Sequence, residues 1–140
     1  MPNYTPDCLA ELEYLYNFFK ENNKEKILSN FCNELLITGW NVCKASKEYG
    51  VTPHVFNENM LNLYKNSDAF IYECTIGGID IDKINKDKFI VNYINENCSK
   101  KRLNILCYGD GIGLDSQTHA ENGHHVTYFD FEGSTSNFAQ

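Results

Sequence analysis

The feature that most constrains the fold is a glycine-rich turn between two short apolar runs. Glycine occupies every second position at Gly109, Gly111 and Gly113. The apolar run before it, residues 103–107, is typical of a strand buried on both faces. The run after it, His125–Phe129, is rich in β-branched and aromatic residues and predicts a second strand. Strand, turn, helix and strand in this order predict a parallel unit with a right-handed crossover, the start of an open α/β sheet.

Residues 113–122 fit a short helix between the two strands, and Gly123 supplies its C-terminal stop. Ligands of such sheets bind beyond the carboxyl ends of the strands, where glycine lets a ligand approach the backbone and the helix presents free N–H groups. Asp130 follows the second strand, 21 residues after Gly109. An acid at this position accepts hydrogen bonds from the ribose hydroxyls of an adenosine-containing cofactor.

Two observations argue against a dinucleotide as that cofactor. The dinucleotide fingerprint has glycine or alanine at its sixth position, whereas this chain has Leu114 or Ser116, depending on which glycine starts the count. Asp110 lies inside the turn and Asp115 in the first helical turn. Each carboxylate would oppose a nearby pyrophosphate by about 1 kcal/mol or more.

A positively charged adenosine cofactor without phosphate avoids this repulsion. S-adenosylmethionine is such a cofactor, because it joins adenosine to a sulfonium and an amino-acid tail. Tyr108, Phe129 and Phe131 flank the turn and the acid. Their rings could stack on adenine or face the sulfonium, although Phe129 equally suits a plain core position.

The segments ILCYGDGIG and GHHVTYFDFEG resemble motif I and the second-strand acid of the class I, Rossmann-like S-adenosylmethionine-dependent methyltransferases. The resemblance covers residues 103–140, and YKNSDAFIYECT (residues 64–75) is more loosely similar to a segment that precedes motif I. It implies that the glycines form the turn against the cofactor, that Asp130 binds the ribose and that Phe131 lies beside the adenine. The expected cofactor-binding residues are Tyr108, Gly109, Asp110, Gly111, Gly113, Asp130 and Phe131. Cys107 stands where the family usually has an acid, so contact with the methionine amino group would fall to Asp110 or to water.

Helical periodicity dominates the rest of the chain, so we expect a helical segment over residues 1–100 and a partial Rossmann-like cofactor-binding domain over residues 101–140. The expected helices begin at Thr5-Pro6, at Lys24, after Gly39, at Thr52-Pro53, at Ser67 or Asp68, at Ile84 and at Ser134 or Thr135. Their expected ends include Leu36, Tyr49 before Gly50, the Gly77-Gly78 pair and Asn97. Phe138 is the first residue of the last helix expected to be buried.

The net charge of −7 argues against nucleic acid or an anionic membrane as a partner. No apolar run is long enough to span a bilayer and no secretory signal is apparent, which favours a cytoplasmic protein. The six cysteines form no CxxC pair, so we expect reduced, mostly buried thiols and no metal. His124 and His125 are expected in a solvated turn.

Two strands make an incomplete sheet, because both edges and one face remain unpaired. We therefore expect a fragment, truncated after the second strand, or a second chain that completes the sheet. The main hypothesis is an S-adenosylmethionine-dependent methyltransferase, or its cofactor-binding portion, acting on a small molecule or an unknown acceptor, and the helical segment could form a lid over the site. One alternative is an NAD-type oxidoreductase domain, and another is a non-enzymatic helical interaction module with a vestigial glycine turn. No residue is assigned a catalytic role, since positioning carries much of the rate of methyl transfer.

Overall fold

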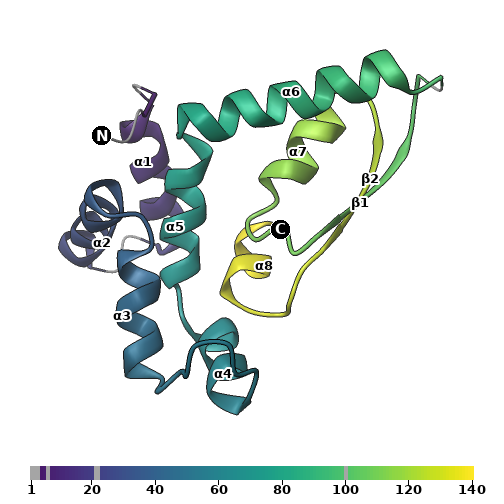
Figure 1. Ribbon diagram of the computed structural model, residues 1–140. Coiled ribbons are helices and arrows are strands. Elements are labelled where there is room, and N and C mark those ends of the chain that lie inside the picture. Colours follow the sequence, from purple (N-terminus) through teal and green to yellow (C-terminus); the bar gives the residue numbers. More distant parts are fainter. Residues whose placement is uncertain (1–3, 6, 21–22, 100) are drawn as a thin grey trace.

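The computed structural model describes residues 4–5, 7–20, 23–99 and 101–140 (Figure 1). The fold is α/β and mostly helical, with a small parallel sheet of two strands near the C-terminus. In chain order the described elements are α1 Cys8–Phe18, α2 Lys24–Leu36, α3 Trp40–Glu48, α4 Glu58–Asn66, α5 Ala69–Gly78, α6 Ile81–Asn97, β1 Asn104–Tyr108, α7 Leu114–Glu121, β2 His125–Phe129 and α8 Ser134–Phe138.

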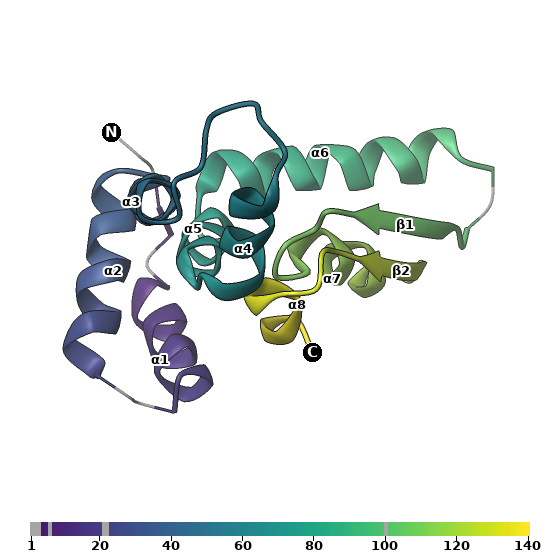
Figure 2. The same cartoon turned by 90° about the horizontal axis from the view of Figure 1, so that it is seen from below.

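Helix α5 forms the centre of the molecule. Its sequence, AFIYECTIGG, is apolar around most of its circumference, and such a helix is stable only when it is surrounded. Ile71, Tyr72 and Ile76 are buried in one hydrophobic cluster with Leu15 of α1 and Phe31 of α2. Helices α1 to α3 lie on one side of α5, and the strands lie on the other (Figures 1 and 2).

The segment that follows residue 100 shares this core. Phe138 of α8 belongs to the cluster around α5, and Ile112 of the glycine turn packs against it. The ring of Phe138 also meets Tyr14 and Phe18 of α1 edge-on, at centroid distances of 5.2 and 4.6 Å. The predicted cofactor region and the helical segment therefore form one packed unit, and α6 reaches from α5 across to the start of β1 (Figures 1 and 2).

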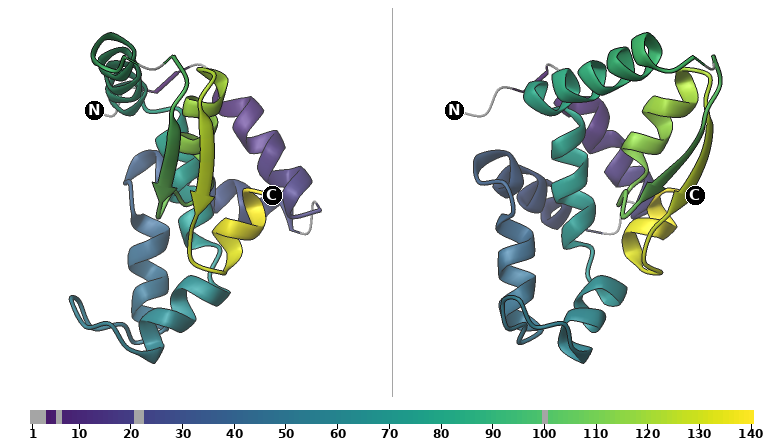
Figure 3. Two further views of the ribbon diagram at one scale, coloured as in Figure 1. Left: turned by 90° about the vertical axis from the view of Figure 1, so that its right-hand side faces the viewer. Right: turned by 45° about the vertical axis from the view of Figure 1, so that its right-hand side comes forward.

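The sheet has the predicted parallel connection, with α7 as the crossover. Strands β1 and β2 pair in register from Asn104 opposite His125 to Tyr108 opposite Phe129. The expectation that β1 is buried on both faces is wrong, because Leu106 is 63% exposed and Tyr108 76% exposed. The two strands lie in front of α7 in the left panel of Figure 3, and no described helix covers the face toward the viewer. Helix α7 packs on one face only.

Several expected boundaries are confirmed. Helix α2 spans the predicted residues, and β2 has the predicted bounds. Helix α3 ends just before Gly50, and α5 runs to the end of the Gly77-Gly78 pair. These signals are local, so the sequence alone is enough to find them. The predicted start of α6 at Ile84 is wrong, because the helix begins three residues earlier, at Ile81, where the Asp80 side chain accepts a hydrogen bond from the Asp82 N–H.

Two further expected helix starts are wrong, because the residues there make other bonds. The Thr5 N–H donates to the Ile79 carbonyl beside a bridge between Tyr4 and Asp80, and α1 begins at Cys8; Pro6 lies outside the described residues. Residues 52–55 form a turn closed by the Val55 N–H, which donates to the Thr52 carbonyl; within it His54 has a φ of +63°, which a helix cannot accommodate. Helix α4 starts later, where Asn57 accepts a hydrogen bond from the Met60 N–H.

Helix α8 also differs in detail from its prediction. Gly133 stands at its N-cap, and Thr135 and Ser136 are buried ahead of Phe138. Among the described residues, none of the helices combines the length and apolar character that a bilayer crossing requires.

Candidate cofactor site

The glycine loop (residues 109–113) has the backbone conformation that the sequence predicts. Gly109, Gly111 and Gly113 have φ values of +72°, +58° and +87°. Residues with a Cβ rarely adopt this left-handed conformation, which costs about 1–2 kcal/mol per residue. The alternating glycines therefore fix a turn that reverses direction between the end of β1 and the start of α7.

Each glycine meets a different environment. No described atom lies within 4 Å of the position that a Cβ would take at Gly109. At Gly111 the same position lies 2.9 Å from the Sγ atom of Cys74 in α5, and at Gly113 it lies 3.6 Å from Ala139. The loop is therefore open to a ligand at Gly109, whereas Gly111 is packed against the chain's own core.

Asp110 accepts hydrogen bonds from two of the N–H groups at the start of α7 that were expected to be free for a ligand. Its Oδ1 accepts a hydrogen bond from the Asp115 N–H at 3.0 Å, and its Oδ2 accepts one from the Ser116 N–H at 2.7 Å. The expectation that the N-terminus of α7 presents free donors is wrong for these two residues. Asp110 serves first as a helix cap, so any contact with a methionine amino group would be additional to that role.

Gly109 and Asp130 line one cavity of about 270 Å³ beyond the carboxyl ends of the two strands. Ligands of open α/β sheets bind at this position. The other lining residues are all aromatic: Phe56, Tyr64, Tyr108, Phe129 and Phe131. The predicted Tyr108, Gly109, Asp130 and Phe131 thus come together, whereas Asp110, Gly111 and Gly113 do not line this cavity.

Two of the aromatic residues, Phe56 and Tyr64, come from the helical segment and are not among the site residues predicted from the sequence. Tyr64 lies on α4, and Phe56 lies in the connection between α3 and α4. In the sequence Phe56 follows Val55, and the two fit the apolar side of the helix expected after Pro53, so no local signal marks Phe56 as a site residue. Its place at the cavity depends on long-range packing.

The rings around the cavity form two groups. Tyr108 and Phe129 stack across the strand pair, with ring centroids 5.1 Å apart and an interplanar angle of 11°. Phe131 is tilted against Tyr64, with centroids 6.2 Å apart. Phe131 is also 42% exposed, so a bound ring could reach its face.

The loop has a negative electrostatic environment. Burial raises the pKa of Tyr128 to about 12, and the carboxylates of Asp130 and Asp110 add to this effect. The Tyr128 hydroxyl donates a hydrogen bond to the Gly111 carbonyl at 2.7 Å, so both charges act on the loop itself. Asp115 contributes less than expected, because Lys83 binds its carboxylate at 2.9 Å.

Cys74 lies behind the loop as a partly buried free thiol. Burial raises its pKa to about 11, and the charge of Glu73 raises it further. A thiol with a raised pKa carries little of the thiolate form that reacts as a nucleophile or binds metal. Cys74 therefore serves as packing against Gly111.

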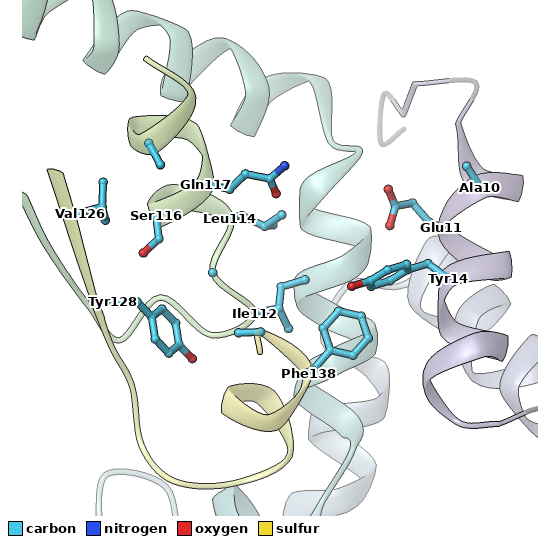
Figure 4. Close-up of a pocket in the computed structure, with 13 residues that line it drawn as sticks. Ala10, Glu11, Tyr14, Ile112, Leu114, Ser116, Gln117, Val126, Tyr128 and Phe138 are labelled. Carbon is cyan, nitrogen blue, oxygen red and sulfur yellow. The ribbon is translucent and has the colours of Figure 1, made fainter. Parts of the chain in front are cut away.

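A larger cavity of about 780 Å³ separates α1 from α7 (Figure 4). Glu11 and Tyr14 point into it from α1, opposite Gln117 of α7 and Ile112 of the loop (Figure 4). Burial raises the pKa of Glu11, and the charge of Asp7 adds to the shift. This cavity has Gly113 in its lining but neither Gly109 nor Asp130, so it is not where the predicted site residues converge.

The histidines and cysteines form no metal site in the part of the chain that the structure describes, where no three metal-binding side chains gather. His124 is buried, and its Nδ1 lies 3.4 Å from the Leu103 N–H, so the solvated turn expected there is wrong for this residue. Cys32, Cys43 and Cys98 are exposed, which contradicts the expectation of mostly buried thiols.

Comparisons of the chain with protein-family models, with curated proteins and with solved structures give no match.

Proposed function

We propose that the chain binds S-adenosylmethionine through the Gly109–Asp130 cavity and belongs to a methyltransferase that acts on a small molecule. The observation that carries the proposal is that one cavity joins an unobstructed glycine backbone, a carboxylate and aromatic rings beyond two parallel strands. These are the groups that an adenosine requires.

The nucleoside half of the cofactor fits the residues present. Asp130 would accept hydrogen bonds from the ribose hydroxyls, and Gly109 would allow the ribose to approach the backbone. The rings of Phe131 and Tyr108 offer faces for the adenine or the sulfonium. When bound, the cofactor supplies a methyl group made electrophilic by the positive sulfur.

The methionine half has fewer partners on this chain. Cys107, where an acid is usual, is buried beside Ser116 of α7. Asp110 already accepts two helix N–H groups. We infer that most of the affinity resides in the nucleoside half.

The carboxylates at the loop favour a cationic cofactor over a dinucleotide. Asp110 also closes the helix N-terminus that a pyrophosphate would use. Lys83 pairs with Asp115 and reduces the repulsion of that carboxylate for a phosphate, so an NAD-type domain is the second candidate function.

We further propose that another chain or chain segment covers the open face of the sheet. Leu106, Tyr108 and Phe129 are all more than half exposed there. Such a contiguous apolar face is typical of an interaction surface. The acceptor pocket would then be built together with that partner.

The experiment is a thermal denaturation series with S-adenosylhomocysteine and with NAD⁺. A ligand at 100 times its dissociation constant stabilises a protein by about 2.7 kcal/mol, which corresponds to a shift of several degrees. We expect the shift with S-adenosylhomocysteine. A shift with NAD⁺ alone would favour the dinucleotide function, and no shift with either ligand would favour an interaction module.

A further inference from the structure

We propose that Phe56 is a base-stacking residue, so that the helical segment supplies one wall of the nucleoside site. The inference rests on the proposed function and extends it to a residue outside both similar stretches, residues 103–140 and the looser match at residues 64–75. The ligand feature that this wall would recognise is the flat face of a purine that carries no phosphate.

The exposure of Phe56 is the first observation. Its side chain is 72% exposed although it is large and apolar, and it lines the same cavity as Asp130. Leaving such a ring in water forgoes the stabilisation that burial would provide. A ligand ring seated against it would recover that stabilisation at the moment of binding.

The backbone fixes where Phe56 lies. The Val55 N–H donates to the Thr52 carbonyl at 3.1 Å, and His54 has a φ of +63°. A left-handed conformation at a residue other than glycine is strained and persists only where the surroundings impose it. Directly after Phe56, Asn57 caps α4 through the Met60 N–H at 3.2 Å. The ring therefore projects from a turn that is tied at both ends.

Tyr64, which lines the same cavity, is also held in place. Tyr64 stacks on Phe70, with centroids 4.8 Å apart and an interplanar angle of 1°. The carbonyl of Tyr64 packs so closely on Gly133 that a Cβ there would overlap it. Helix α4 is thereby joined to the segment that follows Asp130, and Tyr64 keeps a fixed relation to the carboxylate.

The arrangement selects a flat ring attached to a ribose. Aromatic side chains bind any base through its π-face, while Asp130 selects the sugar hydroxyls. The cavity of about 270 Å³ is slightly smaller than the roughly 300–1000 Å³ usual for small-ligand sites, which suits a nucleoside better than a dinucleotide. The Asp130 carboxylate in its lining disfavours phosphate.

The test uses tryptophan fluorescence in the full chain. The protein has one tryptophan, Trp40 on α3, which can be replaced by Trp40→Phe. In that background Phe56→Trp places a reporter at the cavity, and Val55→Trp places a control on the adjacent residue, which does not line it. We expect S-adenosylhomocysteine and 5′-methylthioadenosine both to quench the Phe56→Trp reporter and to leave the Val55→Trp control largely unchanged.

Affinity gives the second measurement. Phe56→Ala should weaken the binding of S-adenosylhomocysteine about tenfold, as loss of one stacked base does, and Phe56→Tyr should restore it. The melting temperature should stay within about 2 °C of the parent, because the ring is exposed. If the parent binds and Phe56→Ala binds equally well without reporter quenching, the inference is overturned and the proposed function stands. If the parent binds neither nucleoside, both are overturned.

Discussion

At Gly111 two constraints act on the same residue. Its φ of +58° disfavours any side chain, and the Sγ atom of Cys74 lies 2.9 Å from where a Cβ would be. The first constraint belongs to the local backbone and could be expected from the glycine spacing. The second depends on α5, which is distant in sequence, and only the structure reveals it.

These two constraints can be separated by a double-mutant cycle. Gly111→Ala should destabilise the protein by about 2–3 kcal/mol, from left-handed strain and from overpacking. In a Cys74→Ala background, which removes the sulfur, the same substitution should cost about 1 kcal/mol less. Urea denaturation measures all four proteins. An equal cost of Gly111→Ala in both backgrounds would show that the contact with Cys74 has no energetic weight.

At the scale of the element, Asp110 holds the N-terminus of α7 with both carboxylate oxygens. Asp110→Ala should therefore destabilise the protein by about 1–2 kcal/mol, the usual effect of losing an N-terminal cap. Asp110→Asn keeps one acceptor and should cost about half as much. Chemical denaturation of the three proteins tests this. Full stability of Asp110→Ala would mean that the carboxylate is available to a ligand instead.

Helices α2 and α5 bring two acidic side chains together. Glu34 is buried and accepts hydrogen bonds from the Gly39 N–H and from Asn41 at the start of α3. Burial raises the pKa of Glu73 on α5 above its ordinary value of 4.5, and the charge of Glu34 raises it further. The folded state therefore binds a proton on Glu73 more readily than the unfolded state does, so stability declines as the pH rises above 4.5 toward the raised pKa.

This electrostatic cost predicts a pH-dependent effect of Glu73→Gln. The substitution should raise the melting temperature at pH 7 by up to about 3 °C, and the gain should vanish below about pH 4, where Glu73 is protonated in both states. The control is Glu48→Gln, which alters an exposed pair with Lys44 and should have little effect at either pH. A gain of the same size at both pH values would contradict the electrostatic explanation.

Local signals account for the elements that the sequence predicts well. Helix α2 and strand β2 have strong periodicity and clear ends, so their bounds could be found without the structure. Periodicity and end signals could not predict three other features: which face of β1 is covered, where Phe56 lies, and that Asp110 caps α7. Each depends on which distant segment packs nearby, and a single sequence does not encode that in a local pattern.

At the scale of the whole molecule, the helical segment and the βαβ unit act together. They share a hydrophobic core through Ile112 and Phe138, and they share a cavity through Phe56 and Tyr64. A ligand in that cavity would contact both parts. We therefore expect its stabilising effect to appear as a shift of the whole unfolding transition rather than as local ordering of the loop.

The central claim is that Asp130 holds the ribose of a phosphate-free adenosine cofactor, and calorimetric titration with S-adenosylhomocysteine tests it most directly. The parent chain should bind, and Asp130→Ala should bind at least tenfold more weakly with an unchanged fold, since a charged hydrogen-bond partner is lost. Glu132→Ala removes the same charge two residues away, outside the cavity lining, and should bind like the parent. Equal affinity of Asp130→Ala and the parent would contradict the claim.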